Sequence, residues 1–110
     1  MAYDEGLATR VRELIGDRPE LSEKTMFGGL AFLLNGNMAC GVRGEDLIVR
    51  LAPEATDKAL SEPGARVFDL SGGRPMRGWL MVGPAGHAED ADLRRWVGRG
   101  VDYALSLPAK

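Results

Sequence analysis

The dipeptide Asn35-Gly36 constrains the fold of this chain more than any other feature, because it stands between two apolar runs. Asn-Gly is the residue pair that favours a type I′ turn, and this turn joins antiparallel strands. The sequence therefore predicts a hairpin, with one strand over residues 23–34 and its partner over 37–42. A third strand is expected at 47–51, after a turn at 44–46, because this segment is rich in β-branched residues.

Two longer segments show the periodicity of amphipathic helices. In residues 4–16, Asp4 suits the N-cap, apolar residues recur on one face, and Gly16 ends the pattern. Residues 90–107 keep their apolar side chains on one side in the same way. A shorter helix is expected to begin at Pro53, since proline is favoured in the first turn of a helix.

Two further strands are expected at 67–70 and 78–82, separated by a polar, glycine-rich loop at 71–75. The element order is then α-β-β-β-α-β-β-α. Strands joined by hairpins form an antiparallel sheet, and helices on one face complete two layers. The sequence therefore predicts an α+β fold, a two-layer sandwich with an antiparallel five-stranded sheet. A chain of 110 residues has the usual size of one domain, so we expect a single domain over 1–110.

Glycine makes up 15 of the 110 residues, about twice its usual share, so particular glycines call for a reason. Gly100 lies on the apolar side of the last predicted helix, and we expect this helix to approach the sheet closely there. Substitution of Gly100 by leucine should then destabilise the fold through overpacking. We expect Gly28-Gly29 to make room for the ring of Trp79 or Trp96, in preference to forming a ligand groove.

Charge and composition argue against several functions. The 14 basic and 16 acidic residues give a net charge of −2, which excludes a generally basic nucleic-acid-binding protein. A lone Cys40 cannot form an internal disulfide, and together with a lone His87 it cannot build a closed zinc site. We interpret Cys40 as a half-buried thiol and His87 as a surface histidine. We expect no metal and no cofactor.

A catalytic set is not evident in the sequence. Ser71 does not lie in a GxSxG motif, and Cys40 would need His87 as its base. The acidic pairs Glu45-Asp46 and Glu89-Asp90 are explained by a hairpin tip and a helix start. We therefore expect a protein that is not an enzyme. An enzyme or small-ligand binder that uses Cys40 and the glycine-rich strands is the alternative.

The arginines fall into two groups. Those of the last predicted helix have acidic residues three or four positions away, so we expect them to be paired within the helix. The expected pairs are Asp90–Arg94, Asp92–Arg95 and Arg99–Asp102. Arg50, Arg74 and Arg77 lack such neighbours and are candidates for an anionic partner. Direct nucleic-acid binding through these three is a second alternative, which the sequence pI of about 5.4 disfavours.

The chain shows no sign of export or of membrane insertion. Its first residues lack a basic segment followed by an apolar one, so we expect no secretory signal. The longest apolar run, 28–34, is far shorter than the ~20 residues of a membrane helix. We therefore expect a cytoplasmic protein with no membrane partner.

Four segments together resemble the N-terminal domain of the TfoX/Sxy family: 23–32, 35–38, 40–42 and 75–78, with the core pattern MFGG, NGN and PMRG. The resemblance covers nearly the whole chain. It implies a compact α+β domain similar to the secretion-chaperone-like fold. It also implies a link to the regulation of natural competence, in which two-domain members act with a transcription activator at particular promoters. Because the sequence stops at Lys110, we expect a stand-alone, single-domain member, and the resemblance supplies no catalytic residues.

These observations predict a non-enzymatic protein-interaction module that is accessory to transcriptional regulation. The expected partner is a protein, such as a transcription regulator or an RNA polymerase component, and a homodimer through the sheet face or edge is also expected. The candidate partner-binding or ligand-binding residues are Met26, Phe27, Gly28, Gly29, Arg50, Arg74, Met76 and Arg77.

Overall fold

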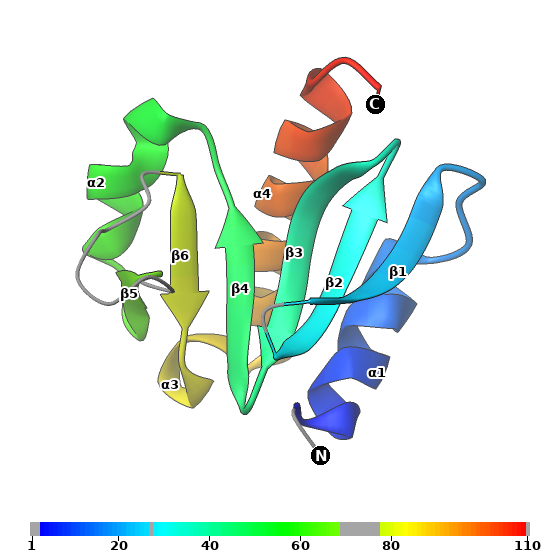
Figure 1. Ribbon diagram of the computed structural model, residues 1–110. Coiled ribbons are helices and arrows are strands. Elements are labelled where there is room, and N and C mark those ends of the chain that lie inside the picture. The colour runs from blue at the N-terminus through cyan, green and yellow to red at the C-terminus, as the bar shows by residue number, and fades with distance from the viewer. Residues whose placement is uncertain (1–2, 27, 69–77, 110) are drawn as a thin grey trace.

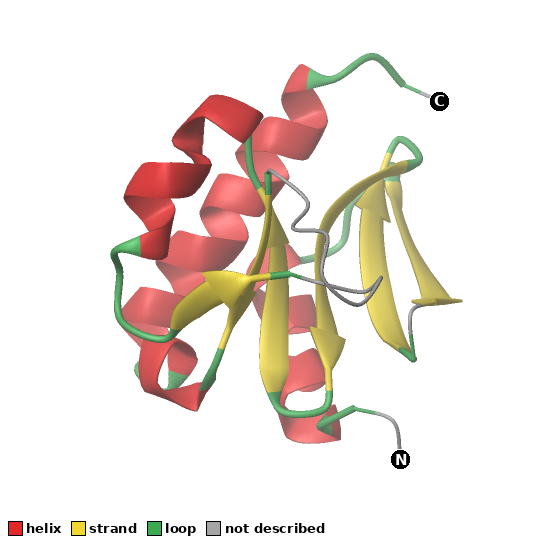
Figure 2. Ribbon diagram, turned by 60° about the vertical axis from the view of Figure 1, so that its left-hand side comes forward, coloured by secondary structure: helices red, strands yellow, loops and turns green. Residues whose placement is uncertain are grey.

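The computed structural model describes residues 3–26, 28–68 and 78–109, which form a sheet with helices packed on one face (Figures 1 and 2). Within these residues the sheet has six antiparallel strands in the order β1-β2-β3-β4-β6-β5. The strands are β1 (Leu21–Met26), β2 (Gly29–Leu34), β3 (Asn37–Arg43), β4 (Asp46–Arg50), β5 (Ala65–Val67) and β6 (Trp79–Val82). The helices are α1 (Glu5–Ile15), α2 (Thr56–Leu60), α3 (Pro84–His87) and α4 (Asp90–Ser106), and a 3-10 turn, η1 (Pro53–Ala55), leads into α2. The α+β two-layer fold is thus confirmed.

The predicted hairpin at Asn35-Gly36 is confirmed. Asn35 has a φ of 53° and Gly36 a φ of 81°, and a type I′ turn needs positive φ at both positions. The turn joins β2 to β3 antiparallel, with Leu34 opposite Asn37. Asparagine and glycine are the residues that accept this backbone conformation most readily, so the local sequence alone sets the turn.

The single strand expected at 23–34 is wrong: the segment holds two strands, which raises the strand number from five to six. β1 and β2 form a hairpin in which Met26 pairs with Gly29, and Gly28 has a φ of 76°. The expected indole packing is also wrong. A Cβ added at Gly29 would lie 2.1 Å from the carbonyl oxygen of Val42, so neighbouring backbone occupies that space. The continuous apolar pattern concealed a turn.

The predicted helices form close to their expected limits. Asp4 caps α1, because its carboxylate oxygen accepts hydrogen bonds from the backbone N–H groups of Gly6 (2.8 Å) and Leu7 (3.2 Å). Gly16 follows the helix with a φ of 74°. The short helix α3, by contrast, was not expected from the sequence. Of the strand expected at 67–70, Val67 lies in β5, whereas Phe68 lies in no strand; residues 69–77, which include the rest of that strand and the loop at 71–75, lie outside the described residues.

The main core lies between the helices and the sheet, and Trp96 of α4 is fully buried in it. The expected close approach at Gly100 is confirmed, since a Cβ there would lie 2.3 Å from the carbonyl oxygen of Ala39. A β-bulge explains why this carbonyl protrudes. Phe32 pairs with Cys40 and Leu33 pairs with Met38, so Ala39 is the extra residue of β3.

Candidate interaction surface

One face of the sheet carries no helix among the described residues, and it has a small apolar core of its own. In Figure 1 this face is turned toward the viewer, and α1 and α4 lie behind the sheet. Its buried residues are Ala31, Met38, Ile48 and Phe68, and Leu33, Trp79 and Met81 pack against them half-exposed. Phe68 contacts Trp79, with ring centroids 6.2 Å apart. We call this surface the helix-free face.

A groove of about 450 Å³ opens on the helix-free face, and its lining residues are Gly28, Arg43, Gly44, Asp46 and Met81. Gly28 lies in the β1–β2 turn and Gly44 in the β3–β4 turn, and no atom would contact a Cβ within 4 Å at either position. Their φ values of 76° and 58° favour glycine. The turn conformations therefore leave the groove without side chains at these two points.

Arg43 gives the groove a positive charge. Asp46 opposite it is already engaged, because its carboxylate lies 2.8 Å from the guanidinium of Arg66. Within the described parts of the chain, the arginines in ion pairs are Arg10, Arg12, Arg18, Arg66, Arg95 and Arg99, and those in none are Arg43, Arg50 and Arg94. Lys24 pairs with Ala31 across the β1–β2 ladder and so projects from the same face.

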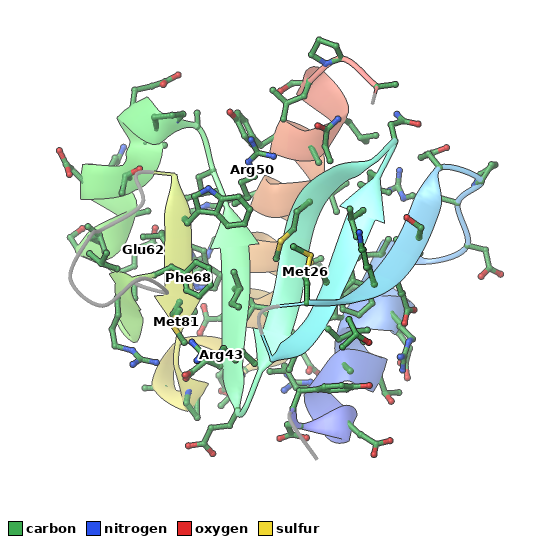
Figure 3. All side chains as sticks on the ribbon, in the orientation of Figure 1. Met26, Arg43, Arg50, Glu62, Phe68 and Met81 are labelled. Carbon is green, nitrogen blue, oxygen red and sulfur yellow. The ribbon has the colours of Figure 1, made fainter. Side chains whose placement is uncertain are left out.

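The structure places Arg50 away from this groove. Its guanidinium lies 5.1 Å from the ring centroid of Trp79 and 5.6 Å from that of Tyr103, so it is stacked between a strand and α4. Arg50 is four residues beyond Asp46 on β4, about 13 Å along an extended strand. Figure 3 shows Arg43 and Met81 next to each other and Arg50 at the opposite end of β4.

The structure therefore does not bring the predicted site residues together at one place. Gly28 lines the groove, and Met26, at the end of β1, is 39% exposed but is not one of the lining residues. Gly29 serves the close contact between β2 and β3. Phe27, Arg74, Met76 and Arg77 lie outside the described residues. Sequence reasoning missed Arg43 and Met81 as surface residues. The alternation of buried Val42 with Arg43 indicated that the arginine faces away from the main core, but only strand pairing brings it near Met81.

The pairing expected for the arginines of the last helix is only partly right. Asp92 and Arg95 are paired at 3.2 Å, as expected. Arg95 also binds Glu62, however, and Arg99 binds the other carboxylate oxygen of Glu62 at 2.6 Å instead of pairing with Asp102. Asp90 pairs with Arg10 of α1 at 3.0 Å, not with Arg94. The reason is tertiary: α1 and the segment after α2 bring carboxylate and guanidinium partners to α4.

Glu62, which follows α2, links this segment to α4 through ion pairs with Arg95 and Arg99. Burial opposes its ionisation, but hydrogen bonds from Arg99 and Arg95 outweigh that cost and lower the pKa of the Glu62 carboxyl. A second hollow, of about 380 Å³, lies between these helices and includes Glu62 and Arg99 in its lining. Lys58 and Asp102 also line this hollow, so its lining carries two basic and two acidic side chains.

The lone cysteine was expected to be half-buried and the lone histidine to lie on the surface; both expectations are wrong, because both side chains are buried. Cys40 is completely buried in the main core, and burial raises the pKa of its thiol to about 12. His87 is only 6% exposed, and its Nε2 lies 2.8 Å from the carbonyl oxygen of Glu45. A carbonyl only accepts, so Nε2 is the protonated nitrogen and donates. The short helix α3, which the sequence did not indicate, carries His87 inward.

The described residues contain neither a metal-binding cluster nor a membrane-spanning helix. Among them, no group of three or more histidine, cysteine and acidic side chains is arranged to hold a metal ion. No helix of the parts described has both the length and the apolar character needed to cross a bilayer.

The fold and the groove together define a small α+β domain with one helix-covered and one helix-free sheet face. Residues 13–104 match the family model of the TfoX N-terminal domain, and the chain belongs to this family, as the resemblance of its motifs implied. Neither the curated proteins nor the solved structures contain a match to the chain. The likeness to the secretion-chaperone-like fold therefore stays a prediction.

Proposed function

We propose that this protein is a non-enzymatic interaction module that acts as an accessory to transcriptional regulation of the competence type. Membership of the TfoX N-terminal domain family carries the proposal. The helix-free face supports it, because this face combines an accessible groove, an uncompensated guanidinium at Arg43 and an exposed methionine at position 26. Apolar area with a few charged groups is what a protein partner recognises.

The enzyme alternative has less support than the interaction module. It depended on Cys40 as a nucleophile, and a thiol nucleophile must reach its substrate as a thiolate. Cys40 is fully buried, and the pKa of its thiol is raised to about 12. The groove has no catalytic set of residues among those described: Asp46 is held by Arg66, and Arg43 and Met81 provide no general base at neutral pH.

Direct DNA binding is also less favoured than binding through a protein partner. The net charge is −2, and the two unpaired arginines of the described strands lie far apart: Arg43 ends β3, beside the start of β4, whereas Arg50 ends β4. A protein that grips DNA through its phosphates usually presents several basic residues on one continuous surface. We therefore propose that the chain reaches its promoters through a protein partner.

A homodimer formed through the edge strand β1 is disfavoured by charge. β1 lies at the edge of the sheet and could pair with β1 of a second copy. If the two copies of β1 pair antiparallel around a two-fold axis perpendicular to the sheet, the helix-free faces of both copies lie on the same side, and one residue of β1 lies opposite its own copy. In the two registers that pair the most residues, this residue is Glu23 or Lys24. Like charges directly opposite each other destabilise such a pair. A dimer, if formed, would use another surface.

Transcript measurement tests the proposed function. RNA is sequenced from cells with the gene, without it, and with it restored, under conditions that induce DNA uptake. We expect a defined set of transcripts to fall without the gene and to recover on restoration. In parallel, fluorescence anisotropy of duplex DNA with the pure protein should show no binding at about 50 mM salt. Unchanged transcripts would refute the regulatory role, and tight DNA binding would refute the accessory role.

A further inference from the structure

We propose that the groove at Arg43 binds an acidic, apolar-flanked segment of a protein partner in extended conformation. A carboxylate of the segment pairs with Arg43, and its apolar side chains lie against Met81 and Met26. The inference rests on the proposed function, to which it adds the chemistry of the partner.

Charge is the first argument for an acidic occupant. Arg43 lines the groove and has no carboxylate within ion-pair distance among the described residues, although most arginines described have one. The nearest acid across the ladder, Asp46, is neutralised by Arg66 at 2.8 Å. Lys24 adds a second positive charge on the same face. This patch is positive in a protein whose net charge is −2, so a complementary partner is negative.

Shape is the second argument and favours an extended segment. The groove reaches from Gly28, in the turn before β2, to Met81 on β6, and β3 and β4 lie between. Strands are spaced about 4.8 Å apart, so crossing from β2 to β6 spans about 14 Å, or about four residues of extended chain. Gly28 and Gly44 themselves carry no side chain, and a Cβ at either position would meet no atom within 4 Å.

Two methionines of the helix-free face give the third argument, although only Met81 lines the groove itself. Met81 is half-exposed in its wall, and Met26 is 39% exposed on the neighbouring hairpin. Figure 3 shows both on the helix-free face, with Arg43 near Met81. Methionine is unbranched and adapts its shape to the side chain that it meets. A segment in which acidic and apolar residues alternate therefore satisfies Arg43 and both methionines at once.

The inference is tested with a fluorescein-labelled peptide of about eight residues in which glutamate and leucine alternate. A second peptide carries glutamine in place of glutamate, and a duplex of about 20 base pairs serves as the nucleic-acid probe. The pure full-length protein is titrated into each, and anisotropy is measured. We expect the acidic peptide to bind, the glutamine peptide to bind at least about fivefold more weakly, and the duplex not to bind. Binding of the duplex without binding of the acidic peptide would overturn the inference.

Two pairs of variants locate the site. Arg43→Gln should weaken binding of the acidic peptide at least about fivefold, whereas Arg94→Gln, which removes an unpaired arginine of α4, should change it less than about twofold. Met26→Glu should weaken binding, whereas Leu105→Glu should not, although the two wild-type side chains are similarly exposed at 39% and 40%. Met26→Glu keeps the test decisive if Arg43→Gln fails to fold. Equal binding by both members of each pair would refute the site.

Failure of this inference is distinguishable from failure of the proposed function. The gene carrying Arg43→Gln is restored to cells that lack it, and the transcripts are measured again. Transcript levels like those of the deletion support the acidic partner. If Arg43→Gln restores wild-type levels while the deletion lowers them, the acidic-partner inference is wrong and the regulatory role stands.

Discussion

The close contact between α4 and the bulge of β3 predicts that any side chain at position 100 destabilises the fold. A Cβ at position 100 would lie 2.3 Å from the carbonyl oxygen of Ala39, and real Cβ atoms essentially never approach another heavy atom within 3.0 Å. In Gly100→Ala, α4 or the bulge must therefore retreat by at least 0.7 Å, the difference between these distances. The obstacle is backbone, which cannot rotate away as a flexible side chain could.

The cost of this retreat follows from what α4 buries. Trp96 and Ala104 are fully buried on the same helix face, and a gap of 0.5–1 Å forfeits roughly a quarter to a half of each dispersion contact. Overpacking of a core costs about 1–3 kcal/mol, and a backbone obstacle favours the upper end. Because alanine has a better helix propensity than glycine, the substitution also stabilises the helix by about 1 kcal/mol, which offsets part of this cost. We therefore expect Gly100→Ala to destabilise the protein by about 2 kcal/mol.

Gly98→Ala is the matched control. Gly98 lies in the same helix, and no atom would contact a Cβ there within 4 Å. This variant should gain about 1 kcal/mol, so the two alanine variants should differ by about 3 kcal/mol with opposite signs. Urea denaturation followed by circular dichroism and by the fluorescence of buried Trp96 measures both. A Gly100→Ala protein as stable as wild type, or a melting temperature unchanged by Gly100→Leu, would refute the close approach.

Three further predictions concern buried and paired groups. Native Cys40 should resist a thiol reagent at neutral pH and react only on unfolding, because its thiol is buried and its pKa is raised to about 12; rapid native labelling would contradict this. Glu62→Gln should cost about 1 kcal/mol at neutral pH, measured by urea denaturation. Because the pKa of Glu62 is lowered in the folded protein, its contribution to stability is present above its ordinary pKa of 4.5 and is lost as the pH falls through the folded value. The difference in unfolding free energy between wild type and Glu62→Gln should therefore shrink on acidification. A difference that does not shrink would count against the pairing of Glu62 with Arg95 and Arg99. His87→Leu should destabilise by about 1–3 kcal/mol, because the carbonyl of Glu45 loses its donor, and an unchanged urea midpoint would disprove this role.

Much of the fold could be predicted because its signals are local. The turn at Asn35-Gly36, the cap at Asp4 and the periodicity of the last helix each depend on a few consecutive residues, and each is confirmed. The segment 23–34 was mistaken because its apolar run continues through a turn. Gly28 supplied the missing signal, since a left-handed glycine between two extended segments marks a hairpin.

The candidate surface could be predicted only in part. Met26 and Gly28 were identified from an unusual motif; Gly28 does line the groove, and Met26 is exposed at the end of the neighbouring strand β1. Arg50 was grouped with the other unpaired arginines, but strand β4 carries it to the opposite end of the sheet. Arg43 was overlooked, because its lack of a carboxylate partner depends on Arg66, which is distant in sequence and occupies Asp46.

The local conformations follow from the sequence alone. So does one long-range feature, the close approach at Gly100, because a glycine on the apolar face of a helix leaves room for a neighbouring backbone. Three features depend on the folded arrangement: the position of β6 between β4 and β5, the pairing of Glu62 with two arginines of α4, and the groove at Arg43. The difference lies in the range of the forces. Backbone preferences act between neighbours, whereas strand order and charge pairing depend on where the chain returns in space.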